Sequence, residues 1–208
     1  MILSIIAIII SSIAVIISGL TFYYHFLLKA KITLEFSNDE NKPYIVEGKI
    51  DGVQYKWIRI KTFCSNKIFN VSARNLHLKM LNVERWNEVE NKWNNLNPIN
   101  LFYLRWVIND GIDKSFIFRG DLTWNEPQYF NLATLFDDNN KQLLCPGIPG
   151  QGNVIGWKPD QWFKEGCFRY TVGIYGDNVI IPRHKTHDYK ICINFGNNGK
   201  VSFCSEVK

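Results

Sequence analysis

The first 28 residues contain no Asp, Glu, Lys or Arg, and this run constrains the fold more than any other feature of the chain. The run consists mostly of Ile, Leu, Val and Ala, with a few serines whose hydroxyls can bond back to the preceding helical turn. As a helix of about 1.5 Å per residue it reaches roughly 40 Å, which exceeds the roughly 30 Å of a hydrocarbon core. The sequence therefore predicts one transmembrane helix over residues 1–28, in contact with the lipid bilayer.

A cleaved secretory signal is the alternative for this segment. Such a signal has a basic start, an apolar stretch of about 7–15 residues and a small-x-small cleavage site. Here no Lys or Arg precedes the apolar run, the run is too long, and Ser18-Gly19 is a weak cleavage candidate. We therefore expect an uncleaved anchor. Lys29 and Lys31 follow the helix, so the positive-inside rule places the following domain in the cytoplasm, with an extracytoplasmic domain as the alternative.

Residues 29–208 have the size and composition of one folded domain. The chain contains seven Trp and fourteen Phe, and 46% of its residues are hydrophobic, which supplies enough material for a core. The net charge is +5, but Lys and Arg are scattered among acidic residues instead of forming a basic patch. We therefore predict no nucleic-acid partner.

The five cysteines have irregular spacing and no C-x-x-C pair, so they predict neither a disulfide framework nor a zinc site. We expect free thiols that pack as small hydrophobic side chains. A bridge between Cys64 and Cys167 is the alternative, because immunoglobulin domains carry an inter-sheet disulfide, but that bridge requires an oxidising compartment.

Polar and apolar residues alternate with a period of two through most of residues 29–208, which is typical of half-buried strands. We expect strands over residues 31–37, 44–49, 57–62, 72–83, 101–108, 114–118, 129–135, 167–175, 188–195 and 200–205. Short strands separated by polar turns, without a long helical pattern, predict an all-β fold. The predicted fold class is an immunoglobulin-like β-sandwich of about seven to nine antiparallel strands, preceded by the transmembrane helix.

Individual segments allow finer predictions. Within the strand over residues 57–62, Ile58 and Ile60 are expected to face the core, while Arg59 faces solvent. Residues 84–95 are expected to form either a helical turn or a hairpin. Residues 137–165 are predicted to be one long irregular segment crossing the surface, because the stretch from 145 to 159 is rich in Gly and Pro.

A set of sequence motifs adds a family resemblance that covers most of residues 52–195. The motifs are Trp57-Ile58-Arg59-Ile60-Lys61, Ser72-Ala73-Arg74-Asn75-Leu76, Leu104-Arg105-Trp106, the stretch 121–135, and Gly166 to Val172 followed by Tyr175-Gly176-Asp177-Asn178. In this order they resemble a widespread prokaryotic family of uncharacterised proteins with one N-terminal membrane helix and an immunoglobulin-like β-sandwich. The chain departs from that family at residues 166–168, where Pro-Gly-Thr-Tyr is usual, and in its Gly-rich insertion. The resemblance implies the fold and no catalytic residues.

No group of residues in the sequence forms a catalytic constellation. His184 and His187 are three residues apart, and on a strand such a pair points to opposite faces, so we predict no metal site. The acidic groups lack a partner across a cleft, and no Gly-x-Ser-x-Gly or Cys-His pattern occurs. We therefore predict no catalytic residue, no cofactor and no small-molecule substrate.

Tryptophan provides the candidate interaction residues. Trp106 lies in an apolar strand and is expected to be a core residue. Exposed tryptophans and arginines often anchor protein interfaces, so we predict an interaction patch formed by Trp124, Trp157, Trp162 and Arg119. The sequence then favours a membrane-anchored, non-enzymatic module that binds an unidentified protein through its loops or an edge strand. An extracytoplasmic module for carbohydrate or another ligand is the alternative function.

Overall fold

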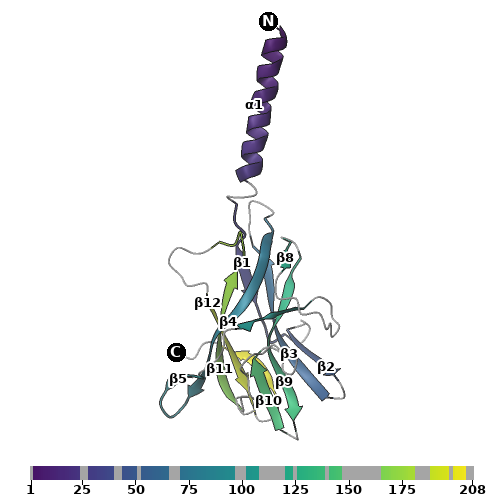
Figure 1. Ribbon diagram of the computed structural model, residues 1–208. Helices are drawn as coiled ribbons and strands as arrows, with labels where there is room; N and C mark the ends of the chain where they lie inside the picture. The colour runs from purple at the N-terminus through teal and green to yellow at the C-terminus, as the bar shows by residue number, and fades with distance from the viewer. Residues whose placement is uncertain are drawn as a thin grey trace.

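A computed structural model shows an N-terminal helix followed by a domain built from strands (Figure 1). It describes residues 2–23, 28–39, 44–50, 53–65, 71–96, 102–107, 120–123, 126–138, 141–146, 165–180, 188–196 and 199–204. The helix α1 (Ile2–Phe22) has 21 residues, and none of them is buried. Its length and composition make it a candidate membrane-spanning helix, which confirms the apolar helix predicted from the sequence.

The strands form two antiparallel sheets, as the alternating sequence predicts. The six-stranded sheet contains β1 (Ile32–Glu35), β2 (Ile45–Ile50), β3 (Val53–Cys64), β7 (Arg105–Val107), β9 (Gln128–Asp138) and β10 (Lys141–Pro146). The seven-stranded sheet contains β4 (Ala73–Asn87), β5 (Lys92–Asn95), β6 (Phe102–Tyr103), β8 (Gly120–Leu122), β11 (Gly166–Tyr175), β12 (Asp188–Phe195) and β13 (Val201–Cys204). In the described part of the chain, β3 and β9 form the centre of the first sheet, and β4, β11 and β12 form the centre of the second.

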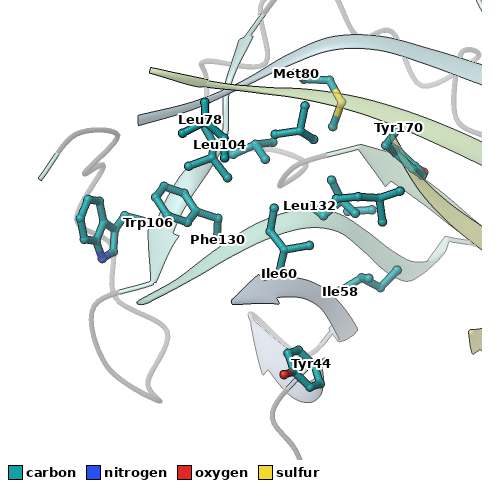
Figure 2. Close-up of a cluster of buried hydrophobic side chains, with 14 of the residues drawn as sticks. Tyr44, Ile58, Ile60, Leu78, Met80, Leu104, Trp106, Phe130, Leu132 and Tyr170 are labelled. Atoms are coloured by element: carbon teal, nitrogen blue, oxygen red, sulfur yellow. The ribbon is translucent and has the colours of Figure 1, made fainter. Parts of the chain in front are cut away.

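The core lies between the two sheets, where their inward-facing side chains interdigitate (Figure 2). The first sheet contributes Ile58, Ile60, Phe130 and Leu132, and the second contributes Leu78, Met80 and Tyr170. Each of these side chains is fully excluded from solvent. Burial of a large apolar side chain stabilises the folded state by about 1.5–3 kcal/mol, so this layer holds the sheets together. The arrangement confirms the expectation of a two-sheet, sandwich-like domain.

The prediction that Arg59 faces solvent is wrong. Only 5% of Arg59 is exposed, and its Nε donates a hydrogen bond to Oδ1 of Asn131 on the neighbouring strand β9 at 3.3 Å. Burying a charged group requires such polar partners. The alternation correctly predicted that Ile58 and Ile60 lie in the core, but it does not reveal that the opposite face of this sheet is covered as well.

The stretch predicted as a single strand over residues 101–108 is divided between the two sheets. β6 pairs with β4, and β7 pairs with β9. Leu104 lies between them, fully buried, and its N–H donates to the Leu78 carbonyl at 2.8 Å. Trp106 then packs against Phe130 with 5.1 Å between ring centroids and donates from Nε1 to Gln128 Oε1 at 2.8 Å. Its 6% exposure confirms the prediction of a core tryptophan.

Two of the irregular segments contain more strand than the sequence pattern indicated. Residues 84–95 form the β4–β5 hairpin, so the helical-turn alternative is wrong; Asn91 takes the left-handed turn conformation with φ of 49°. Residues 137–165 are not irregular throughout, because β9 extends to Asp138 and pairs with β10. Pro146 ends that strand, where the missing N–H of proline is tolerated. The predicted strand over residues 114–118 lies outside the described residues.

The helix is joined to the sandwich by a short, bonded connection. The N–H of Leu28 donates to the carbonyl of Tyr23 at 3.0 Å, and Ala30, two residues further on, is fully buried. Ala30 donates to the Asn178 carbonyl at 2.7 Å and accepts from Ile180 N–H at 2.8 Å. Figure 1 shows α1 leaving the end of the domain where β1 begins, with the β4–β5 hairpin at the far end. If α1 spans a bilayer, the sandwich therefore lies close to the membrane surface.

Asn178 organises this end of the domain. It lies in the turn that follows β11, and only 7% of it is exposed. Its Oδ1 accepts from the Arg74 N–H at 2.8 Å, and its Nδ2 donates to the Ser72 carbonyl at 2.8 Å. The side chain thus bonds the start of β4 while its backbone bonds Ala30. One residue links the juxtamembrane segment to both β4 and β11.

Candidate functional site

The outer face of the seven-stranded sheet carries charged side chains and thiols instead of the large apolar residues of the core face. On β11, Phe168 and Tyr170 are fully buried in the core, so Cys167 and Arg169 project to the opposite face. Neighbouring strands place their own outward-facing residues beside these two. We call this surface the outer face of β4, β11, β12 and β13.

Arg169 is held in place by an acid and by an aromatic ring. Its Nε and Nη2 donate to the two carboxylate oxygens of Glu84 on β4 at 2.7 and 2.9 Å. Its guanidinium lies 4.4 Å from the ring centroid of Trp93 on β5. The side chains of Arg169 and Glu84 are 12% and 15% exposed, so solvent screens this bidentate ion pair only weakly. Trp86 packs against Trp93 edge to face at 5.3 Å, which extends the ring surface to the β4–β5 hairpin.

Three thiols lie beside this charged pair. Cys167 on β11 and Cys204 on β13 have their sulfurs 3.6 Å apart. Cys192 on β12 is the direct cross-strand partner of Cys204, and its other neighbour in register is Arg169. Sequence positions 167, 192 and 204 are thus brought together by the pairing of three successive strands. The sequence predicted cysteines outside disulfides, and these three form no disulfide, but it did not predict that they cluster.

The thiol environment favours the protonated form. Burial, with the neighbouring Cys167 and Cys192 acting in the same direction, raises the pKa of the Cys204 thiol to about 12. Burial also raises the pKa of Cys167, partly offset by its hydrogen bond with Cys204. The thiols are therefore protonated near neutral pH and react slowly, since the thiolate is the nucleophile. This excludes the lowered thiol pKa that activates catalytic cysteines.

Cys64 stands apart from this cluster. It is buried on β3 in the other sheet, and its sulfur donates to the Leu122 carbonyl at 3.6 Å. Burial raises the pKa of the Cys64 thiol, with an opposing effect from the Ala73 backbone. The alternative of a Cys64–Cys167 bridge is wrong, because Cys64 and Cys167 are both free and Cys167 adjoins Cys204 instead.

An aromatic cluster occupies the half of the outer face that is nearer to α1. His77 on β4 stacks on Tyr175 at 5.5 Å and meets Tyr103 edge to face at 5.2 Å. Tyr103 is 37% exposed and Tyr175 is 38% exposed. The Nζ of Lys79 lies over the Tyr103 ring, 5.7 Å from its centroid, and so adds a positive charge to the aromatic cluster. We call His77, Tyr103 and Tyr175 the juxtamembrane aromatic patch, since Tyr175 precedes the turn that binds Ala30.

A hollow of about 520 Å³ opens at the far end of the sandwich. The β4–β5 hairpin contributes Trp86 and Asn94 to its wall, and β11 contributes Cys167. Gly166 has φ of +147°, which side chains disfavour, and a Cβ there would lie 3.0 Å from Nε of Arg85. The Arg85 guanidinium fits into the space and donates to the Glu165 carbonyl at 2.7 Å. Cys167 is thus the member of the thiol cluster that borders the hollow.

The interaction patch predicted from the sequence cannot be placed. Trp124, Trp157, Trp162 and Arg119 lie outside the described residues, as do His184 and His187. Over the described ranges, no group of three His, Cys, Asp or Glu residues has an arrangement that could hold a metal ion. Tyr103 and Tyr175, two of the exposed aromatic residues that the structure places, were missed because each lies in an apolar strand pattern.

Comparison with protein-family models, with curated proteins and with solved structures finds no match to this chain. The class of protein that the observations define is therefore a two-sheet domain attached to one candidate membrane-spanning helix. The resemblance to a prokaryotic family stays a prediction from the sequence motifs.

Proposed function

We propose that this chain is a single-pass membrane protein whose immunoglobulin-like domain binds a protein partner at the membrane surface, without enzymatic activity. The observation that carries the proposal is the juxtamembrane aromatic patch, which presents two partly exposed tyrosines within a few residues of the anchored end of the domain. Tyrosine is enriched at the energetically important positions of protein interfaces. A partner anchored in the same membrane could contact this patch, because the patch lies close to the membrane surface.

The strand connections support the immunoglobulin-like assignment. In their side-by-side order, β1, β3, β9 and β7 take the positions of strands A, B, E and D in one sheet. In the other sheet, β12, β11 and β4 take the positions of strands G, F and C, with β5 next to β4 as an added C′ strand. The chain adds β2, β6, β8, β10 and β13 to that arrangement.

The protected edge of β13 favours binding through the outer face over binding through that edge. Asn38 accepts a hydrogen bond from Phe203 N–H at 2.6 Å and donates to the Phe203 carbonyl at 2.7 Å. The amide of Asn38 thus occupies the backbone groups that an added strand would use. Phe36 also packs on Phe203 at 5.0 Å, which closes the sandwich on this side.

Site-specific photocrosslinking in native membranes tests the proposal. A benzoylphenylalanine in place of Tyr175 should give a discrete adduct with another membrane protein after irradiation. The matched control replaces Lys49, which is exposed on β2 of the opposite sheet, and should give no such adduct. Equal adducts from both positions, or none from Tyr175, would contradict binding through this patch.

We further propose that the domain is cytoplasmic, on the strength of Lys29 and Lys31 after the helix. Val89, at the tip of the β4–β5 hairpin, is 95% exposed and offers a labelling position. A Val89→Cys variant should resist a membrane-impermeant maleimide in intact cells and react after permeabilisation, with the unsubstituted chain as the background control. Labelling of intact cells would place the domain outside.

If the domain is extracytoplasmic, carbohydrate binding is the second candidate function. The hollow at the far end favours it, because Trp86 and the amides of Asn87 and Asn94 line one wall. An aromatic face beside amide groups is suited to a sugar ring and its hydroxyls. Glycan-array binding by the full chain that disappears in Trp86→Ala would support this function.

A further inference from the structure

We propose that Cys192 and Cys204, beside the thiol of Cys167, form a thiol–disulfide site, so that oxidation ties the edge strand β13 to the sheet. The inference rests on the register that places Cys204 opposite Cys192 and on the backbone bonds that orient β13, and it does not depend on the proposed partner binding.

Cys192 and Cys204 have suitable backbone positions for a disulfide. The Phe203 N–H and carbonyl bond to Asn38, so they point away from β12. In an antiparallel pair the next residue then belongs to a hydrogen-bonded pair, for which the Cα atoms are about 5.5 Å apart. Cys204 and Cys192 are that pair. This spacing lies within the roughly 4.4–6.8 Å that disulfides span.

Cys167 is a neighbouring thiol and not a second disulfide partner. Its sulfur lies 3.6 Å from that of Cys204, but strand β12 separates its strand β11 from β13. Strands two apart in a sheet are roughly 9.5 Å apart, which exceeds the roughly 4.4–6.8 Å between the Cα atoms of a disulfide. Asn38 and Phe36 hold β13 in the register that places Cys204 opposite Cys192.

The reaction needs an oxidant, and glutathione disulfide is a suitable one. Two thiols, Cys192 and Cys204, reduce one glutathione disulfide: the protein S–S bond forms, the glutathione S–S bond breaks, and two glutathione thiols carry away the protons. Burial keeps the Cys204 thiol protonated at neutral pH, so we expect the oxidation to accelerate as the pH rises.

Peptide mapping of the full chain in detergent micelles tests the site. After incubation with glutathione disulfide at pH 8.5, non-reducing proteolysis and mass spectrometry should find an intramolecular disulfide that joins Cys204 to Cys192. The oxidised chain should unfold at a higher urea concentration than the reduced chain, and dithiothreitol should reverse the shift. Cys192→Ser should lose the disulfide, and Cys167→Ser should keep it.

Matched variants keep the test decisive. Cys204→Ser and Cys204→Ala should both lose the disulfide and the redox-dependent shift, whereas Cys64→Ser, which removes the thiol outside the cluster, should keep both. The urea midpoint of each reduced variant shows whether it folds, and either Cys204 variant suffices if it matches the reduced parent chain. A disulfide that contains Cys167, a bond between two molecules only, or no disulfide at all would overturn the proposal.

Discussion

Replacing Asn178 by alanine should destabilise the sandwich strongly, because this one side chain bonds two backbone groups at the anchored end. Asn178→Ala removes the bonds to the Arg74 N–H and the Ser72 carbonyl, both at 2.8 Å. Asn178 is 7% exposed, so water reaches the freed groups poorly. Leaving a buried polar group unpaired costs about 1–3 kcal/mol. For two groups, with some relaxation, we expect a loss of about 2–4 kcal/mol.

The assay is urea unfolding of the full chain in mild detergent, followed by tryptophan fluorescence. Asn194→Ala is the matched control: Asn194 is exposed on the outer face of β12, so its replacement should change the free energy of unfolding by less than about 0.5 kcal/mol. If Asn178→Ala were as mild as this control, then Asn178 would not organise the juxtamembrane connection.

Other substitutions probe the packing, the ion pair and the thiols. Gly48→Ala places a Cβ 2.3 Å from the Trp57 ring, so it should displace that ring, cost about 1–3 kcal/mol in urea unfolding and alter the near-ultraviolet circular dichroism. Glu84→Ala leaves the weakly exposed Arg169 without its carboxylate and should cost about 1–3 kcal/mol. The pKa of the Cys204 thiol is raised on folding, so the stability that this thiol contributes is present below its unfolded pKa near 9 and is lost as the pH rises above that value. Cys204→Ser should therefore reduce the fall of the urea midpoint above pH 9.

The packing and ion-pair predictions have control variants, and the thiol prediction has a contradicting outcome. Lys49→Ala, beside Gly48, should leave the Trp57 signal unchanged. Glu47→Ala removes a more exposed ion pair with Lys56 and should cost less than about 0.5 kcal/mol, so an equal effect for Glu84→Ala would contradict its partial burial. An unchanged pH slope in Cys204→Ser would show that its thiol is not protected from ionisation.

Sequence alternation predicted the strands well because one face of each such strand packs against the opposite sheet. Leu76, Leu78 and Met80 follow a period of two and all lie in the core, since one face of β4 covers the other sheet. The sequence pattern does not reveal that residues 101–108 are divided between two sheets, because Leu104, where the chain crosses from one sheet to the other, is apolar and buried like a strand residue. Local patterns specify which face is buried, and they do not specify which sheet provides the partner.

The candidate site was largely hidden from sequence reasoning for the same reason. Cys167, Cys192 and Cys204 meet only because β11, β12 and β13 pair in one register, and the loop between β11 and β12 does not fix that register in advance. Alternation does place Cys167 and Arg169 on one strand face, opposite Phe168, which was the available signal. The role of Asn178 had a weaker signal, a Gly-Asp-Asn turn after a strand, which predicts the turn and not its bonds to Ala30 and β4.

The whole account depends on α1 remaining in the chain and in a bilayer. Alkaline carbonate extraction of native membranes, followed by the intact mass of the extracted protein, tests this most directly. We predict that the protein stays in the membrane pellet and that its mass includes residues 2–23. A chain that appears in the supernatant, with a mass that begins after the apolar run, would contradict a membrane-anchored domain.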